Sequence, residues 1–224
     1  MFKKFRFFIA TFFKLCRVFF QMLGGSIRFS NLNFPVVTIF GGHDLKQEDI
    51  YAKKAYELSR LLAQANFSLL TGGGPGIMQA ASQGARSVDG KVKVIGVGVT
   101  KLDAQNPYLT DYFEVDRFYG RKWLLMRFSK AFVFFPGGYG TFDELFEVLN
   151  LVRTLRTPQV PIILFGYEFW KACDEWLRTE VIKHGAITEK DLNLYYITDD
   201  INQALCIISE KCNMPINKKI EHYQ

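Results

Sequence analysis

Two glycine-rich segments contain the residues best suited to chemistry. Residues 72–78 read GGGPGIM, and residues 136–144 read PGGYGTFDE. Glycines let a backbone approach a ligand closely, and a helix that starts after such a loop offers unpaired N–H groups to an anion. In the second segment Thr141 can cap that helix and add a hydroxyl, and Glu144 adds a carboxylate. The pattern favours a site for a phosphorylated ligand.

Both segments also have a purely structural interpretation. Residues 72–78 can form a tight turn without a ligand, and the spacing of Thr141 and Glu144 is that of a helix capping box. The glycine density of two separate segments favours a ligand instead. The spacing is not GxGxxG and no acidic residue follows about 20 positions on, so a standard dinucleotide site is weakly supported. No lysine follows the glycines of residues 136–144, which excludes a Walker P-loop.

Arg121 and Lys122 are the cations expected to serve this site. They belong to a helical segment that runs into the strand preceding residues 136–144. An isolated Arg-Lys pair usually lies on a solvated surface. Next to a glycine loop it suits phosphate, because arginine binds phosphate through two hydrogen bonds and lysine adds a point charge.

The rest of the chain alternates between apolar runs and helical periodicity. Strands are expected at residues 36–40, 67–70, 92–99, 112–115, 131–135, 160–165 and 195–197, and helices at 47–65, 77–86, 120–129, 141–152, 168–182 and 201–210. This alternation predicts an α/β fold with a doubly wound, mostly parallel sheet flanked by helices. Such sheets bind ligands at the carboxyl ends of their strands, which is where the glycine turns fall.

The net charge of +6 belongs to the start of the chain. Six cations and no acidic residue precede Asp44, whereas the remainder has 22 residues of each sign. Residues 1–23 also contain eight phenylalanines, and helical spacing places most of them opposite the cations. We expect a basic amphipathic helix that ends at residues 24–26 and packs on its own domain, on a dimer partner or on a membrane surface, with a cleaved targeting peptide as a further alternative.

These features predict three regions. Residues 1–34 form the helix and a linker, residues 35–211 the α/β domain, and residues 212–224 a polar tail. A nucleic-acid-binding fold is not expected, because the domain itself is electrically balanced. Four scattered cysteines and three histidines show no ligand spacing, so no metal site is expected. No run of 18 uncharged apolar residues occurs, so a simple transmembrane helix is not expected either.

Taken together, residues 72–78, the Arg121-Lys122 pair and the PGGxGTxxE pattern of residues 136–144 resemble the LONELY GUY (LOG) family. These cytokinin riboside 5′-monophosphate phosphoribohydrolases were long mislabelled as lysine decarboxylases. The resemblance runs from about Pro35 to Ser209. It implies a Rossmann-like, cofactor-free, dimeric or higher even-numbered oligomeric hydrolase that cleaves purine nucleoside 5′-monophosphates, N6-substituted or AMP itself, into free base and ribose 5-phosphate.

The resemblance also assigns residues. Arg121 and Glu144 match the family's catalytic pair. The expected substrate- and phosphate-binding residues are Gly41, Gly42, Gly73, Gly74, Gly76, Met78, Lys122, Gly137, Gly138, Tyr139, Gly140, Thr141 and Asp143. Asp143 is also a weak candidate for the acid that protonates the leaving base.

One departure from the family concerns the loop after the first strand, which reads Gly41-Gly42-His43-Asp44 where members often have Gly-Ser. The alternative function is a non-catalytic carrier of a nucleotide or cofactor on the same fold. A decarboxylase is disfavoured, because nothing marks a cofactor or a Schiff-base lysine. The expected location is the cytoplasm, and association with a membrane through residues 1–23 is the alternative.

Overall fold

A computed structural model describes residues 2–30, 32, 35–102 and 104–214. Its centre is a seven-stranded sheet in the order β4-β3-β2-β1-β5-β6-β7, and every neighbouring pair is parallel. The strands are β1 (Val36–Phe40), β2 (Ser68–Thr71), β3 (Val94–Val99), β4 (Asp111–Val115), β5 (Ser129–Phe134), β6 (Ile162–Phe165) and β7 (Tyr196–Thr198). The predicted parallel sheet is confirmed.

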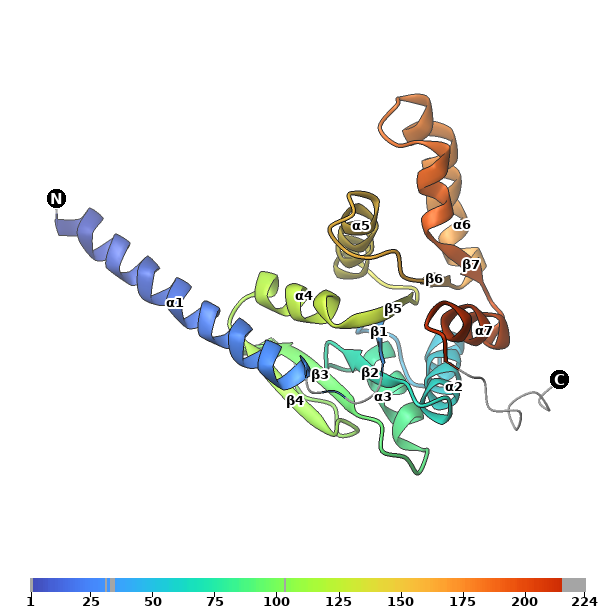
Figure 1. The fold of residues 1–224 in the computed structure, drawn as a ribbon, viewed down its shortest axis with the longest axis horizontal. Coiled ribbons are helices and arrows are strands. Elements are labelled where there is room, and N and C mark those ends of the chain that lie inside the picture. Colours follow the sequence, from blue (N-terminus) through green and yellow to red (C-terminus); the bar gives the residue numbers. More distant parts are fainter. Residues whose placement is uncertain (1, 31, 33–34, 103, 215–224) are drawn as a thin grey trace.

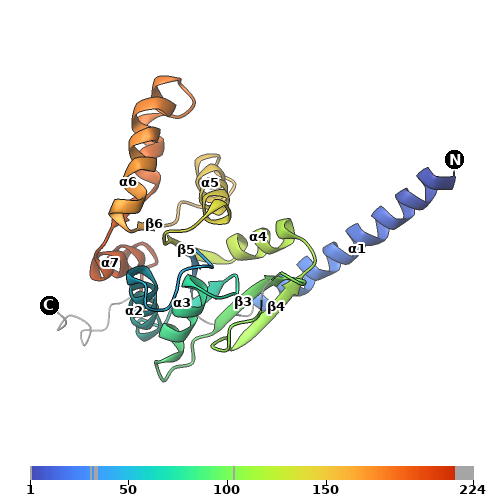
Figure 2. The ribbon, with the colours of Figure 1, turned by 180° about the vertical axis from the view of Figure 1, so that it is seen from behind.

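Helices cover both faces of this sheet (Figures 1 and 2). They are α1 (Phe2–Ser30), α2 (Ile50–Gln64), α3 (Ile77–Arg86), α4 (Phe118–Arg127), α5 (Tyr139–Arg153), α6 (Tyr167–Trp176) and α7 (Ile201–Lys211), with a π-helical turn at Leu177–Val181 and a 3-10 helix at Glu189–Leu194. One core cluster joins α2, α3 and α7 to one face, and a second joins α4, α5 and α6 to the other.

The strand sequences explain the two cores. Successive side chains of a strand point to opposite faces, and β1 is buried along its whole length. Val37 and Ile39 belong to the first cluster, whereas Val36 and Phe40 belong to the second. A strand buried on both faces is an apolar run rather than an alternating pattern, which is what the sequence shows. The doubly wound α/β class is confirmed.

The first helix differs from the prediction. α1 does not end at residues 24–26 but continues through both glycines to Ser30. The reason is packing: a Cβ on Gly25 would lie 2.8 Å from the Leu124 side chain of α4, so the glycine lets two helices approach closely. The chain from residue 24 to residue 30 is therefore helix, not linker. Residues 31, 33 and 34 lie outside the described residues.

The chain end is described only in part. Cys212 and Met214 pack against the core cluster beside α7. The predicted polar tail beyond residue 214 lies outside the described residues. The predicted helix at residues 168–182 is α6 followed by the π-helical turn.

Candidate active site

The candidate site lies where the strand order reverses. β1 pairs with β2 on one side and with β5 on the other, so the loops after β1 and β5 diverge at the carboxyl edge. Ligands of doubly wound sheets bind in this crevice. A cavity of about 220 Å³ opens there. Its lining residues are Phe40, Gly41, His43, Asp44, Met78, Arg121, Gly138, Gly140, Thr141 and Glu144.

Three loops are tied together by backbone contacts around this cavity. The amide of Gly42 donates to the carbonyl of Pro136 at 2.8 Å, and the amide of Ile77 donates to the carbonyl of Gly42 at 3.0 Å. Gly76 caps α3 at φ +65°, in a region that favours glycine, and a Cβ there would overlap the Gly42 carbonyl. The predicted convergence of the three glycine turns is confirmed.

The second glycine loop presents the start of α5 to the cavity. Gly138 is the N-cap and no side chain caps the helix, so the first amides of α5 lack intrahelical acceptors. A Cβ on Gly138 or Gly140 would meet no atom within 4 Å. Both positions therefore leave open space beside amide donors, and a phosphate fits such a place.

Thr141 is the third residue of α5, not its N-cap. The capping interpretation and the capping box with Glu144 are therefore wrong, because the helix already begins at Tyr139. The Thr141 side chain is buried and lines the cavity. Its Oγ1 lies over Gly137, where a Cβ would overlap it. Thr141 thus faces the ligand space rather than the solvent-exposed helix end.

Arg121 reaches the cavity from α4. Its guanidinium lies over Gly72, where a Cβ would overlap Nη2, and Nη2 lies 4.0 Å from Met78 Sδ. The Nε atom is buried and has no hydrogen-bond partner among the described residues. A buried donor without a hydrogen-bond partner destabilises a protein by roughly 1–3 kcal/mol, and the cost is larger when the donor is charged. An anionic ligand that accepts from Nε would remove this cost.

Glu144 faces the same cavity from the second turn of α5. Burial raises the pKa of Glu144 from its ordinary 4.5 to about 7, and the charges of Arg121 and Lys122 oppose this rise. Ionisable groups with such shifts gather at functional sites, because catalysis near neutral pH needs them. Arg121 and Glu144, which the resemblance assigned as the catalytic pair, thus line one cavity.

This pKa shift makes a stability prediction. The pKa of Glu144 is higher in the folded protein than in the unfolded chain, so the folded state binds this proton more tightly. The free energy of unfolding therefore decreases as the pH rises from about 4.5 through about 7. Glu144→Gln should therefore raise the free energy of unfolding at pH 8 by roughly 1–3 kcal/mol and change it little at pH 4. Urea unfolding at both pH values measures this, with the exposed Glu57→Gln as control. Equal effects at both pH values would contradict it.

The first glycine loop is held by a residue that the motif search did not single out. Asn106 is buried, and its Nδ2 donates to the carbonyls of Gly73 and Gly74 at 3.1 and 3.2 Å. Its own amide also donates to Gly73. A buried asparagine fixing two glycine carbonyls sets the shape of the loop beneath Arg121. An Asn-Pro pair outside the glycine motifs gives no local signal for this role.

Several predicted binding residues do not line the cavity. Lys122 forms ion pairs with Asp143 at 2.5 Å and Glu147 at 2.8 Å, so neither Lys122 nor Asp143 points into it. Tyr139 is 97% exposed. Five glycines build the loops without lining the cavity: Gly42, Gly73, Gly74, Gly76 and Gly137. Met78, Gly41, Gly138, Gly140 and Thr141 lie where a ligand would contact them.

The Lys122 pairs join α4 to α5 next to the catalytic candidates. Removing them with Lys122→Met should lower kcat/KM for a nucleotide substrate by about 3- to 10-fold, because a partly exposed ion pair contributes about 1 kcal/mol to holding α4, which carries Arg121, against α5, which carries Glu144. Steady-state kinetics measure this. Lys171→Met, which breaks the exposed pair with Glu168, is the matched control. A hundredfold loss would instead place Lys122 in direct contact with substrate.

His43 and Asp44 are the polar lining residues that the motifs did not assign. They occupy the loop after β1, and His43 Nδ1 lies 3.0 Å from Asp44 Oδ1. The sequence marked this loop only as a departure from the family pattern. Their side chains bring an imidazole and a carboxylate to the lining of the cavity.

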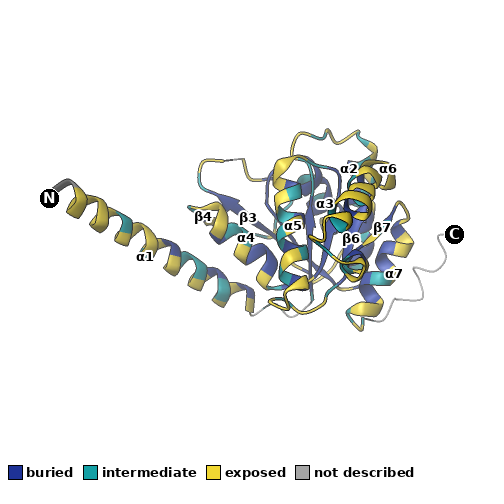
Figure 3. Ribbon diagram, turned by 90° about the horizontal axis from the view of Figure 1, so that it is seen from above, coloured by how far each residue is buried: buried dark blue, intermediate teal, exposed yellow. Residues whose placement is uncertain are grey.

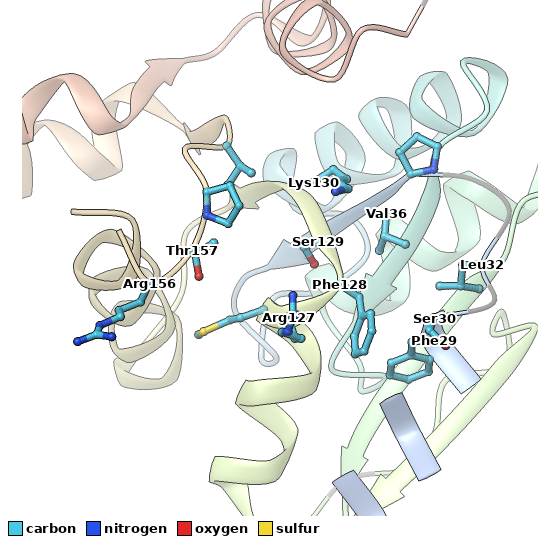
Figure 4. Close-up of a pocket in the computed structure, with 14 residues that line it drawn as sticks. Phe29, Ser30, Leu32, Val36, Arg127, Phe128, Ser129, Lys130, Arg156 and Thr157 are labelled. Atoms are coloured by element: carbon cyan, nitrogen blue, oxygen red, sulfur yellow. The ribbon is translucent and has the colours of Figure 1, made fainter. Parts of the chain in front are cut away.

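A second cavity, of about 710 Å³, lies at the other edge of the sheet (Figure 4). Val36 and Ser129 in its wall begin β1 and β5, so it opens at the amino ends of the strands. Arg127 is the last residue of α4, and Arg156 follows the end of α5. Cations at helix carboxyl ends are stabilised by the helix dipole, so their presence needs no ligand.

Comparisons with known proteins identify the family of this chain. The family model described as "Possible lysine decarboxylase" matches residues 78–208. A cytokinin riboside 5′-monophosphate phosphoribohydrolase of Arabidopsis thaliana is 31% identical over 121 residues, which are 52% of this chain and 56% of that protein. A probable enzyme of the same name from Oryza sativa is 35% identical over 52% of this chain and 48% of its own. The chain thus spans about half the length of these plant relatives.

Solved structures share the fold. The molybdenum cofactor binding protein of Rippkaea orientalis superposes with a TM-score of 0.60 at 20% identity, over 80% of this chain and 97% of that chain. The Moco carrier protein of Chlamydomonas reinhardtii gives a TM-score of 0.60 at 19% identity, over 81% and 99%. At such identities the likeness concerns the fold alone. With the family model covering more than half of the chain, the protein belongs to the lysine-decarboxylase-like family, which is the LOG family that its motifs predicted.

Proposed function

We propose that the protein hydrolyses the N-glycosidic bond of purine nucleoside 5′-monophosphates, releasing the free base and ribose 5-phosphate. The observation that carries this proposal is one cavity that combines three features: a buried Arg121 Nε without a partner among the described residues, a carboxyl group with a pKa of about 7, and an uncapped helix start. The names of the plant relatives describe phosphoribohydrolases of cytokinin riboside 5′-monophosphates, probable in the case of the Oryza sativa protein. AMP and N6-substituted adenine nucleotides are the proposed substrates.

The phosphate would bind at the start of α5. Gly138 and Gly140 leave space there, and the amides of the first turn have no intrahelical acceptors. Thr141 adds a hydroxyl to the same space, and the buried Nε of Arg121 adds a charged donor. Phosphate oxygens would then satisfy donors that protein atoms leave unpaired.

The reaction breaks the bond between C1′ of the ribose and N9 of the purine. The electron pair of that bond leaves with the base, and the sugar acquires oxocarbenium character. The ionised Glu144 carboxylate stabilises this positive charge and accepts a proton from the attacking water, whose hydroxyl becomes bonded to C1′. The base takes up one proton. The His43 imidazole lines the cavity and is the candidate donor, whereas the Asp143 carboxylate is engaged by Lys122.

A nucleotide panel tests the substrate class. Purified protein is incubated with AMP, an N6-isopentenyl AMP, GMP, CMP and adenosine, and released bases are separated chromatographically. We expect adenine or its N6-substituted form from the adenine nucleotides and at least a hundredfold slower release from adenosine, which lacks the phosphate. Equal rates for AMP and adenosine would show that the protein does not recognise the phosphate.

The predicted homodimer and the predicted cytoplasmic location stay predictions. Light scattering measures the first, and cell fractionation measures the second.

A further inference from the structure

α1 extends well beyond the domain that it packs on (Figure 1). Its amino-terminal half is exposed, whereas buried residues appear only from Val18 onward (Figure 3). The helix carries a series of large apolar side chains that are each 45–67% exposed: Phe5, Phe8, Phe12, Phe13, Leu15, Phe19, Phe20, Leu23 and Ile27. Such a concentration of exposed phenylalanine is unusual for a protein surface in water and marks an interaction site.

These side chains share one face of the helix. At about 100° per residue they fall within an arc of about 160°. The opposite side contacts the domain, where Val18 and Phe29 are buried. Arg17 pairs with Asp116 at 2.7 Å, and Arg28 pairs with Asp111. The domain therefore fixes the roll of α1, so that its apolar arc points away from the folded body.

The charges of α1 complement an anionic surface. The helix contains six cations and no acidic residue. The acidic partners of Arg17 and Arg28 lie on the domain, whereas Lys4, Arg6 and Lys14 are exposed and nearer the amino terminus. Among these, Lys4 and Arg6 fall at the two edges of the apolar arc on the helical wheel. Cations bordering an apolar face are typical of helices that lie in a negatively charged membrane interface.

We propose that α1 binds the surface of an anionic lipid bilayer, with its phenylalanine arc inserted among the acyl chains and its axis along the membrane plane. By length and composition the segment from Lys4 to Ser30 could cross a membrane. The packing of α1 opposes crossing, because the helix contacts the domain from Arg17 onward. A second copy of α1 would bring like charges together along both edges.

Vesicle binding by the full chain tests the proposal. Sedimentation with vesicles of phosphatidylglycerol and phosphatidylcholine should pellet the protein, whereas pure phosphatidylcholine should bind it at least tenfold more weakly. Lys4→Gln with Arg6→Gln should remove most of this difference, because electrostatic attraction needs the cations. Equally tight binding of the wild-type protein to both vesicle types would contradict the proposal that it recognises an anionic surface.

A matched pair of phenylalanines tests the orientation. Phe8 lies in the arc, whereas its neighbour Phe7 is equally exposed but lies outside it. Phe8→Ser should lower the partition coefficient at least fivefold and Phe7→Ser less than twofold. Bound protein should be released by alkaline carbonate.

Three results would overturn the proposal. They are equal losses for the two variants, resistance to carbonate, or α1-dependent self-association without vesicle binding. Base release from nucleotides should be the same in both variants, and vesicle binding is measured without it. A negative result for membrane binding would therefore leave the proposed hydrolase activity unaffected.

Discussion

Glu144→Gln is expected to lower kcat/KM for AMP hydrolysis by roughly 10³-fold or more. The substitution keeps the size of the side chain but removes both the negative charge and the ability to accept a proton. General base catalysis and charge stabilisation each contribute about 10²- to 10⁴-fold, and both depend on this carboxylate. Steady-state kinetics at pH 8 measure the loss, and a substrate Kd that changes by less than about tenfold would locate it in the chemical step.

The pH profile gives an independent reading of the same group. The proposed mechanism needs Glu144 ionised, so kcat/KM of the wild type should fall as the pH drops through about 7, the raised pKa of Glu144. Glu147 lies one turn further along α5 and pairs with Lys122, so Glu147→Gln is a control in which this limb should persist. Activity that survives in Glu144→Gln would remove this residue from the mechanism.

Arg121→Ala is expected to lower kcat/KM by roughly 10²- to 10³-fold, with a large part of the loss in KM. The guanidinium is the buried donor of the cavity that lacks a protein partner among the described residues, so it is available for the substrate. Loss of a charged donor to a phosphate or sugar oxygen has this size of effect. Kinetics with AMP measure the change. The charge of Arg121 opposes the rise in the pKa of Glu144 that burial causes. Without this charge the pKa of Glu144 should be higher still, so the low-pH limb of the kcat/KM profile should shift to higher pH in this variant.

The neighbouring arginine supplies the control for this experiment. Arg127 ends the same helix but lies at the opposite edge of the sheet, beside the second cavity (Figure 4). Arg127→Ala should change kcat/KM less than twofold. Gly72→Ala offers a complementary test, because a Cβ there overlaps Arg121 Nη2 and displaces the guanidinium without removing it. Wild-type kinetics in both Arg121→Ala and Gly72→Ala would contradict the assigned role.

The order of strands and helices in the domain could be predicted from the sequence, because strands buried on both faces and amphipathic helices have distinct apolar periods. The prediction of α3 at residues 77–86 agrees with the structure residue for residue. The end of α1 could not be predicted, since Gly24 and Gly25 are a local stop signal. In the structure Gly25 is a helix-packing position against Leu124, a residue about 100 positions away.

In the candidate site too, some residues have a local sequence signal, whereas others depend on contacts across the fold. The resemblance to the LOG family assigned Arg121 and Glu144, and in the structure both side chains line one cavity at the carboxyl edge of the parallel sheet. The pairing of Lys122 with Asp143 and Glu147 depends on how α4 lies against α5, and no local pattern specifies that contact. The role of Asn106 likewise depends on a contact across the fold, with glycines more than 30 residues earlier. Sequence motifs thus predicted the candidate catalytic residues but not the side chains that position them.

The most direct test of the proposed function is product release from AMP by the unmodified protein. Enzyme in excess over AMP should convert it completely into equal amounts of adenine and ribose 5-phosphate, both quantified by mass spectrometry. Calorimetry under the same conditions with Glu144→Gln should show nucleotide binding without turnover. Saturable AMP binding by the wild type, with no adenine released from any adenine nucleotide, would contradict the hydrolase and favour a non-catalytic carrier on this fold.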